Sequence, residues 1–241
     1  MKKTLYFAIF LFSVMIAGCG GGGSTTPDEP TDLEKAQAAT SEGWVSYTGG
    51  SPDYTAALAK FDEAIGYYPS YYEAYIGRIL CSLQLDDYAT ADTAFAYLWT
   101  NRNNAAMTDE IIEAACYAAL TYKANLSTGL TWLTTNKDAI YTILKDVGTT
   151  WKFTRNSVNV FAVNTVYVLL AEMYVTVSGT EDTVAVNITT GAETAGENSK
   201  YDDLERAAYC ITKVNSATLS TTFGMIRTRV KNILTGYGFT F

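Results

Sequence analysis

The sequence predicts an all-α protein whose helices stack as a helical-repeat superhelix, an α-solenoid, behind an apolar N-terminal leader. Three observations predict this fold. Two segments 34 residues apart share one pattern of residue types, their apolar residues recur with the period of a helix, and residues that start and stop helices flank them. Because 48% of the residues are hydrophobic, the chain can bury a substantial core.

The repeated segments are DYTAALAKFDEAIGYYP, from Asp53 to Pro69, and DYATADTAFAYLW, from Asp87 to Trp99. The Asp that opens each segment can cap free backbone amides at a helix start, and Pro69 blocks continuation of the first helix. The intervening YYEAYIGRILCSLQLDDY has apolar residues at helical spacing and predicts a second helix in each unit. Such a pair covers its apolar face only against a stacked copy. The aligned residues are Tyr54 with Tyr88, Ala57 with Ala91, Phe61 with Phe95, and Ala64 with Leu98.

Residues 36–100 resemble the tetratricopeptide repeat (TPR), a 34-residue unit of two helices with aromatic, small and Pro residues at fixed offsets. The residues that fit are Gly43, Trp44, Tyr47, Ala57, Phe61, Ala64 and Pro69 in the first unit and Tyr75, Ala91 and Phe95 in the second. Arg78 and Ile79 depart from the Leu-Gly of the family, and Asn101-Arg102 replaces its closing Pro. The resemblance implies a right-handed superhelix over residues 33–241, with a concave groove lined by the leading helices.

Beyond residue 108 the sequence predicts further helices without the full motif. The stretch SVNVFAVNTVYVLLAEMYVTVSG is apolar almost all round, which indicates a central buried helix or a strand. Leu170, Ala171 and Tyr174 resemble the leading helix of a third repeat, and residues 201–211 its following helix. Between them lies a polar insertion, residues 179–200, in which TVAVNIT is expected to pair as a hairpin. The insertion is either a binding element or a tolerated loop.

The N-terminus begins MKKTLYFAIFLFSVMIAGCGGGG, with two lysines followed by 13 apolar or small residues, Leu5 to Ala17, which are too few to span a bilayer. Ile16-Ala17-Gly18-Cys19 resembles the lipobox of bacterial lipoproteins. The resemblance implies that residues 1–18 are a removed signal peptide and that Cys19 carries diacylglycerol and an acyl chain such as palmitate. Gly20, which is not Asp, implies the outer membrane. Residues 19–32 form a flexible Gly/Ser/Pro tether. The alternative is an ordinary secretory peptide with a chance Cys.

The composition argues against several kinds of function. The chain contains no His, which excludes Ser-His-Asp and Cys-His catalysis and His-bound zinc, and its net charge of −8 with no basic run disfavours nucleic-acid binding. We therefore expect no enzymatic activity, no cofactor and no metal. Asp86-Asp87 and Glu181-Asp182 are expected to be a helix cap and loop charges. Three cysteines, Cys81, Cys116 and Cys210, are expected to be buried thiols, and one disulfide with a free thiol is the alternative.

By resemblance, the groove that would hold a partner is lined by Glu73, Ile76, Leu80, Leu83 and Gln84. A second candidate is an aromatic surface at Tyr68, Tyr71 and Tyr72, whose neighbours Tyr67 and Tyr75 are expected in the core. The first candidate predicts a lipid-anchored scaffold for protein–protein interaction or envelope assembly at the bacterial outer membrane, whose partners are envelope proteins or peptides. The second predicts a glycan- or nutrient-binding lipoprotein.

Overall fold

The structure, a computed structural model, describes residues 29–147, 151–198, 200–215, 217 and 219–241, without the side chains of residues 159 and 161–164. The chain divides into two units, Met1–Pro30 and Thr31–Phe241, and every helix and strand below belongs to the second unit. The predicted signal peptide, Cys19 and most of the tether lie outside the described residues. Within the described ranges, no helix combines the length and the apolar character needed to cross a bilayer.

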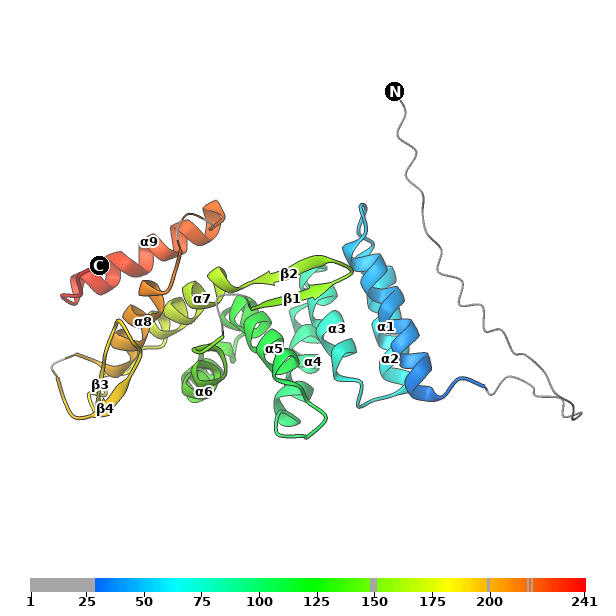
Figure 1. Cartoon of the computed structure of the whole chain (residues 1–241), viewed down its shortest axis with the longest axis horizontal. Coiled ribbons are helices and arrows are strands. Elements are labelled where there is room, and N and C mark those ends of the chain that lie inside the picture. Colours follow the sequence, from blue (N-terminus) through cyan, green and yellow to red (C-terminus); the bar gives the residue numbers. More distant parts are fainter. Residues whose placement is uncertain (1–28, 148–150, 199, 216, 218) are drawn as a thin grey trace, which may run out of the picture. The chain divides into compact units, whose positions relative to one another are not determined.

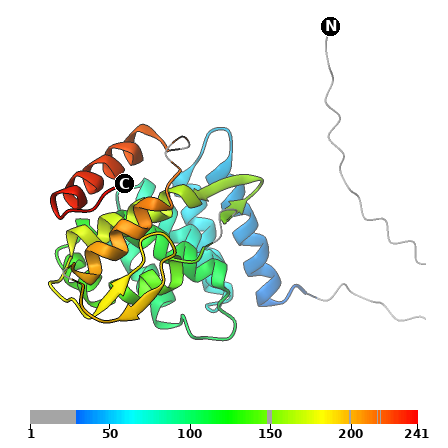
Figure 2. The same ribbon diagram turned by 60° about the vertical axis from the view of Figure 1, so that its left-hand side comes forward.

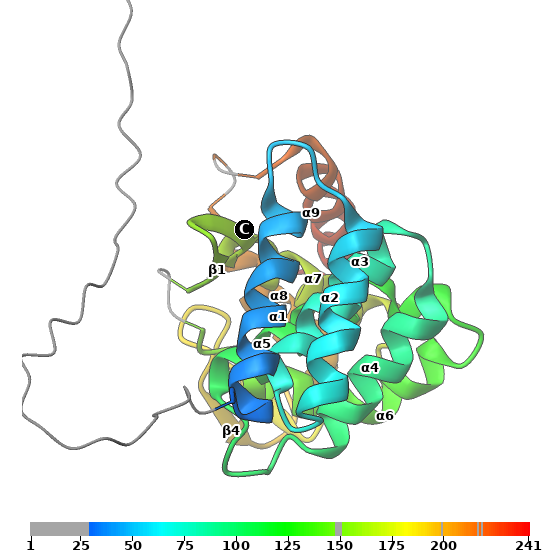
Figure 3. The same cartoon turned by 90° about the vertical axis from the view of Figure 1, so that its right-hand side faces the viewer.

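The second unit is predominantly helical, as the sequence predicts, and begins with two helical hairpins (Figure 3). Helix α1 (Asp32–Thr48) packs on α2 (Tyr54–Tyr67), and α3 (Tyr72–Gln84) packs on α2 and on α4 (Tyr88–Thr100). The two predicted caps are present, because the Asp53 carboxylate accepts a hydrogen bond from the Ala56 amide at 2.9 Å and Asp87 from that of Thr90 at 3.0 Å. The aligned core residues are buried in both segments, namely Ala57, Phe61, Ala64, Ala91, Phe95 and Leu98.

Two glycines inside helices allow this close packing. A Cβ atom at Gly77 of α3 would lie 2.3 Å from the Phe61 ring, and one at Gly43 of α1 would lie 2.8 Å from it. The Trp44 ring closes on Phe61 with its centroid 4.9 Å away. The Phe61 side chain of α2 therefore packs directly against the backbone of α1 at Gly43 and of α3 at Gly77.

The middle of the unit contains α5 (Asp109–Tyr122), the short 3-10 helix η1 (Lys123–Asn125) and α6 (Gly129–Leu144). A nearly buried cation, Lys123, connects them to the second hairpin. Its ammonium lies 2.5 Å from the Asp92 carboxylate of α4 and 4.5 Å from the centroid of the Trp132 ring of α6. An ammonium held over an aromatic face and paired with a carboxylate keeps its charge balanced in a site with little water.

The apolar stretch that begins at Ser157 contains both a strand and a helix. Strand β1 (Lys152–Arg155) pairs antiparallel with β2 (Val158–Ala162), and β2 leads directly into α7 (Val163–Thr176). The turn between the strands has positive φ at Asn156 (47°) and Ser157 (62°), as two-residue hairpin turns require. The hairpin extends from α7 toward α1, across α5 and α3 (Figure 1).

The polar insertion carries the expected hairpin, in which β3 (Val184–Val186) pairs antiparallel with β4 (Glu193–Ala195). It lies against α8 (Asp202–Thr212), which packs on α7 and on the last helix, α9 (Thr221–Gly236) (Figure 2).

Three buried carboxylates in the first turn of α8 hold the insertion. Asp202 accepts hydrogen bonds from the Thr183 amide (3.0 Å) and hydroxyl (2.8 Å), and Glu205 accepts one from the Val186 amide (2.8 Å). Asp203 pairs with Lys137 of α6 and accepts a bond from the Gly179 amide. The insertion is therefore attached to the helices, and removing it would leave buried acceptors without donors, a structural cost that the sequence did not predict.

Candidate functional site

The face predicted as a partner-binding groove is largely closed. Ile76 and Leu80 are only 0% and 5% exposed, and Leu83 is half-buried. Gln84 is exposed at the end of α3, and Glu73 is committed to hydrogen bonds inside the unit. The expectation of an open groove along all five residues is therefore corrected, because its apolar members lie in the core.

The β1–β2 hairpin reaches Glu73 of this face through Arg155, which contacts side chains of α1, α3 and α5. The Nε atom of Arg155 donates to Glu73 of α3 at 2.7 Å, and one of its terminal nitrogens donates to Glu110 of α5 at 3.0 Å. Trp44 of α1 donates its indole N–H to the same Glu73 oxygen at 2.8 Å. Carboxylates shared among charged and aromatic donors in a partly buried site make strong, directional contacts.

Aromatic packing completes the attachment of the hairpin. Phe153 is fully buried, its ring centroid lies 5.8 Å from that of Trp44, and the Arg155 guanidinium stands 4.0 Å from the Phe153 ring. At the tip, Asn156 donates to the Thr48 hydroxyl of α1 at 3.2 Å. The chain thus places Arg155 of its own strand β1 against Glu73, one of the residues for which the sequence predicts a partner. Sequence reasoning missed Phe153 and Arg155. The signal that could have found them is the polar pair Asn156-Ser157 before Val158, which indicates a hairpin turn.

The predicted aromatic surface is smaller than expected. Tyr72 is 5% exposed and belongs to the core, so its assignment to the surface is corrected. Tyr68 is 40% exposed and Tyr71 is half-buried. Tyr75 is buried as expected and donates to the Pro69 carbonyl at 3.1 Å, whereas Tyr67 is 38% exposed and is not a core residue.

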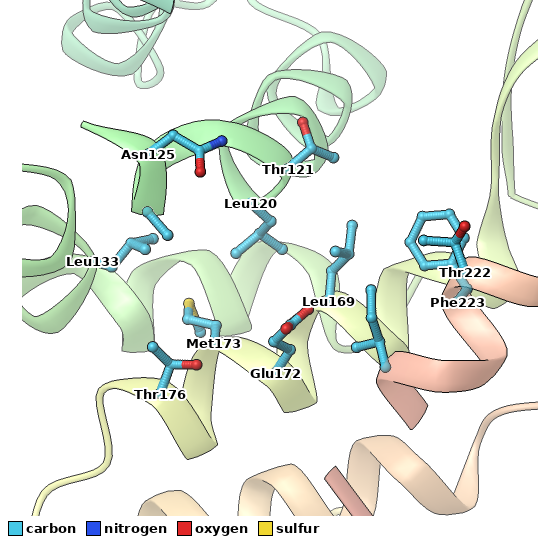
Figure 4. Close-up of a pocket in the computed structure, with 12 residues that line it drawn as sticks. Leu120, Thr121, Asn125, Leu133, Leu169, Glu172, Met173, Thr176, Thr222 and Phe223 are labelled. Atoms are coloured by element: carbon cyan, nitrogen blue, oxygen red, sulfur yellow. The ribbon is translucent and has the colours of Figure 1, made fainter. Parts of the chain in front are cut away.

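A pocket of about 320 Å³ lies between α5, η1, α6, α7 and α9, away from the predicted groove (Figure 4). Its walls are apolar, and its exposed rim carries the hydroxyls of Thr121, Thr176 and Thr222 and the amide of Asn125. The volume and the mixture of apolar walls with a few polar groups are typical of ligand pockets. The apolar lining residues are Leu120, Leu133, Leu169, Met173, Phe223 and Ile226.

One carboxylate, that of Glu172, faces this pocket from α7, between Leu169 and Met173 (Figure 4). Its side chain is 26% exposed, and burial raises its pKa, against the opposing effect of Arg229. Arg229 of α9 donates a hydrogen bond to Glu172 while its own side chain remains 58% exposed. The pocket therefore contains a partly buried carboxylate, paired with Arg229, among apolar side chains.

The cysteines in the described part of the chain are buried free thiols, and none of them joins another in a disulfide. Burial raises the pKa of Cys81 to about 12 and shifts the pKa values of Cys116 and Cys210 upward as well. Thiols held in the protonated form away from solvent are poor nucleophiles. This confirms the expectation of buried, inert thiols at these three positions.

Among the described residues, no three Cys, Asp or Glu side chains gather in an arrangement that could hold a metal ion. Comparisons of the chain with protein-family models, with curated proteins and with solved structures returned no match. The likeness to tetratricopeptide repeats and to lipoproteins therefore depends on the residues of this chain alone.

Proposed function

We propose that this chain is a lipid-anchored scaffold built of tetratricopeptide-like helical repeats, which binds another protein of the bacterial cell envelope. The observation that supports the proposal best is the equivalence of two helical hairpins. Ala57 and Ala91, and likewise Phe61 and Phe95, are 34 residues apart, and all four are buried between paired helices. In this proposal the stacking continues as a superhelix through residues 33–241, and binding rather than catalysis is its purpose.

The membrane attachment in this proposal is supported by the N-terminal sequence. Two lysines, a short apolar run and the small residues before Cys19 fit a lipoprotein signal, and Gly20 favours the outer membrane. The glycines and prolines that follow would act as a flexible tether between the acyl chains and the first helix.

Metabolic labelling with an alkyne analogue of palmitate tests the anchor. The wild-type chain should take up the label and fractionate with the outer membrane. The Cys19→Ser variant should lose the label, whereas Ser24→Ala, a change of similar size in the tether, should keep it. A Cys19→Ser chain that still takes up the fatty acid would contradict the lipid anchor.

Crosslinking of intact envelopes, followed by identification of the captured proteins, tests the scaffold. A scaffold should enrich the same envelope protein with two crosslinkers of different reactivity, and the complex should survive mild detergent. A chain that captures only the proteins recovered with an unrelated outer-membrane lipoprotein would contradict the proposal.

A further inference from the structure

The pocket lined by Glu172 combines apolar walls with a carboxylate, and one kind of side chain can contact both. Its walls of Leu120, Leu169 and Met173 would gain from contact with an aliphatic stem, and its carboxylate would gain from a cation. A lysine side chain has both parts, an apolar stem of four carbons and a terminal ammonium. The pocket is larger than one such stem needs, which leaves room for an apolar neighbour against Phe223.

Arg229 already shows that the Glu172 carboxylate accepts a basic group. The guanidinium reaches it from α9 but is itself 58% exposed. An ion pair between a half-buried acid and an exposed base contributes little net stability, so its exchange for another cation is inexpensive. In this structure Arg229 is the counter-ion of Glu172.

The chemistry of the pocket disfavours the other classes of occupant. An anionic group would meet the charge of Glu172, and a neutral apolar group would desolvate that carboxylate further without replacing its lost hydration. The net charge of −8 on the whole chain also attracts basic partners at long range. A basic side chain would instead pair with the carboxylate, in place of Arg229, and keep the apolar contacts.

We propose that the pocket between α5, α6, α7 and α9 is a docking site for a lysine and an adjacent apolar residue in an extended segment of the partner protein. The proposal rests on the proposed function, since it names the chemistry of the segment that the scaffold would bind. It also moves the binding site from the predicted face of α3 to the pocket beside α9.

Fluorescence anisotropy with labelled five-residue peptides tests this directly, using the full chain in lipid nanodiscs. The first peptide is acetyl-Ala-Leu-Lys-Leu-Ala-amide, and two analogues carry norleucine or Glu in place of the Lys. The lysine peptide should bind saturably, and both analogues should bind about tenfold more weakly or not at all. n-Hexylamine serves as a free cation of the same chemistry, to separate a small-molecule site from a protein-docking site.

Two variants of the ion pair should change the affinity for the lysine peptide in opposite directions. Glu172→Gln should weaken it about tenfold, whereas Arg229→Gln should strengthen it about two- to fivefold by freeing the carboxylate. Glu197→Gln makes the same chemical change at an exposed position and should leave the affinity unchanged. Thermal melting shows that each variant is folded.

The proposal is overturned if the norleucine peptide binds as well as the lysine peptide, if Glu172→Gln leaves binding unchanged, or if hexylamine binds while no peptide does. Envelope crosslinking of the same variants separates this failure from that of the scaffold. A partner captured equally by wild type and Glu172→Gln would remove the pocket proposal and leave the scaffold intact. Absence of any specific partner of the wild-type chain would remove the scaffold itself.

Discussion

Replacing Gly77 by Ala tests the packing around Phe61. In an exposed helix interior, a Gly→Ala change stabilises by about 1 kcal/mol, because Ala has less backbone freedom to lose. At Gly77 the new Cβ would lie 2.3 Å, 2.3 Å and 2.5 Å from three atoms of the Phe61 ring. We therefore expect the helix-propensity gain to be outweighed by overlap.

The magnitude follows from the room available to the ring. Phe61 is fully buried, the Gly43 backbone lies against it on α1, and the Trp44 ring is 4.9 Å from it. Overpacking of a closed site costs about 1–3 kcal/mol, and the overlap with three ring atoms places Gly77→Ala in the upper part of this range, about 2–3 kcal/mol. After the helix-propensity gain of about 1 kcal/mol, the net effect should be a destabilisation of about 1–2 kcal/mol. For a chain of this length, that lowers the melting temperature by about 2–8 °C.

Urea unfolding followed by circular dichroism measures the effect, with Gly66→Ala as the matched control. Gly66 lies in α2, and a Cβ there would meet nothing within 4 Å, so this variant should be unchanged or slightly stabilised. In a Phe61→Leu background, the smaller side chain should remove most of the cost of Gly77→Ala. If Gly77→Ala and Gly66→Ala shift the midpoint by the same amount in the same direction, the packing argument is refuted.

Two further predictions concern the insertion and the thiols. Burial acts to raise the pKa of Asp202, but hydrogen bonds from Thr183 outweigh it and leave the pKa below its ordinary value of 3.8. Asp202→Asn should therefore destabilise the chain by about 1–3 kcal/mol at neutral pH. Wild type should lose this advantage as the pH falls below 3.8 and through the lowered pKa of Asp202, so that the urea midpoints of the two chains become equal there. A difference that persists unchanged at lower pH would contradict the role of the ionised carboxylate. Ellman's reagent should leave Cys81, Cys116 and Cys210 unmodified in the folded chain and react with all three in denaturant, and rapid reaction of any of them in the native state would contradict their burial.

The first two helical hairpins could be predicted because their signals are local. The capping residues Asp53 and Asp87 and the stripe that contains Phe61 and Phe95 act within one or two turns of a helix, so the sequence pattern determines them directly. Strand β3 was likewise predictable from a short β-branched stretch in a polar segment, whereas its partner β4 lies outside that stretch.

The closed groove could not be predicted, because the packing of α5 on α3 and the contact of Arg155 with Glu73 both come from later in the chain. Ile76 and Leu80 suit an apolar groove and a buried interface equally well, and only the packing of other helices around α3 distinguishes the two. The pocket was missed for a similar reason. Its walls come from four α-helices and η1 between residues 120 and 226, and no local pattern relates Glu172 to residues of α5 or α9.

The β1–β2 hairpin also affects how the unit should unfold. A linear array of helical hairpins gains stability only from adjacent neighbours, so its terminal repeat can open alone. Here Arg155 is bonded to Glu73, 82 positions earlier, and Asn156 to Thr48, 108 positions earlier. These long-range contacts should make α1 and α3 open together with the middle of the chain rather than fray from the end. They should also slow folding relative to a repeat array with local contacts alone, because distant segments must meet before the hairpin is in place.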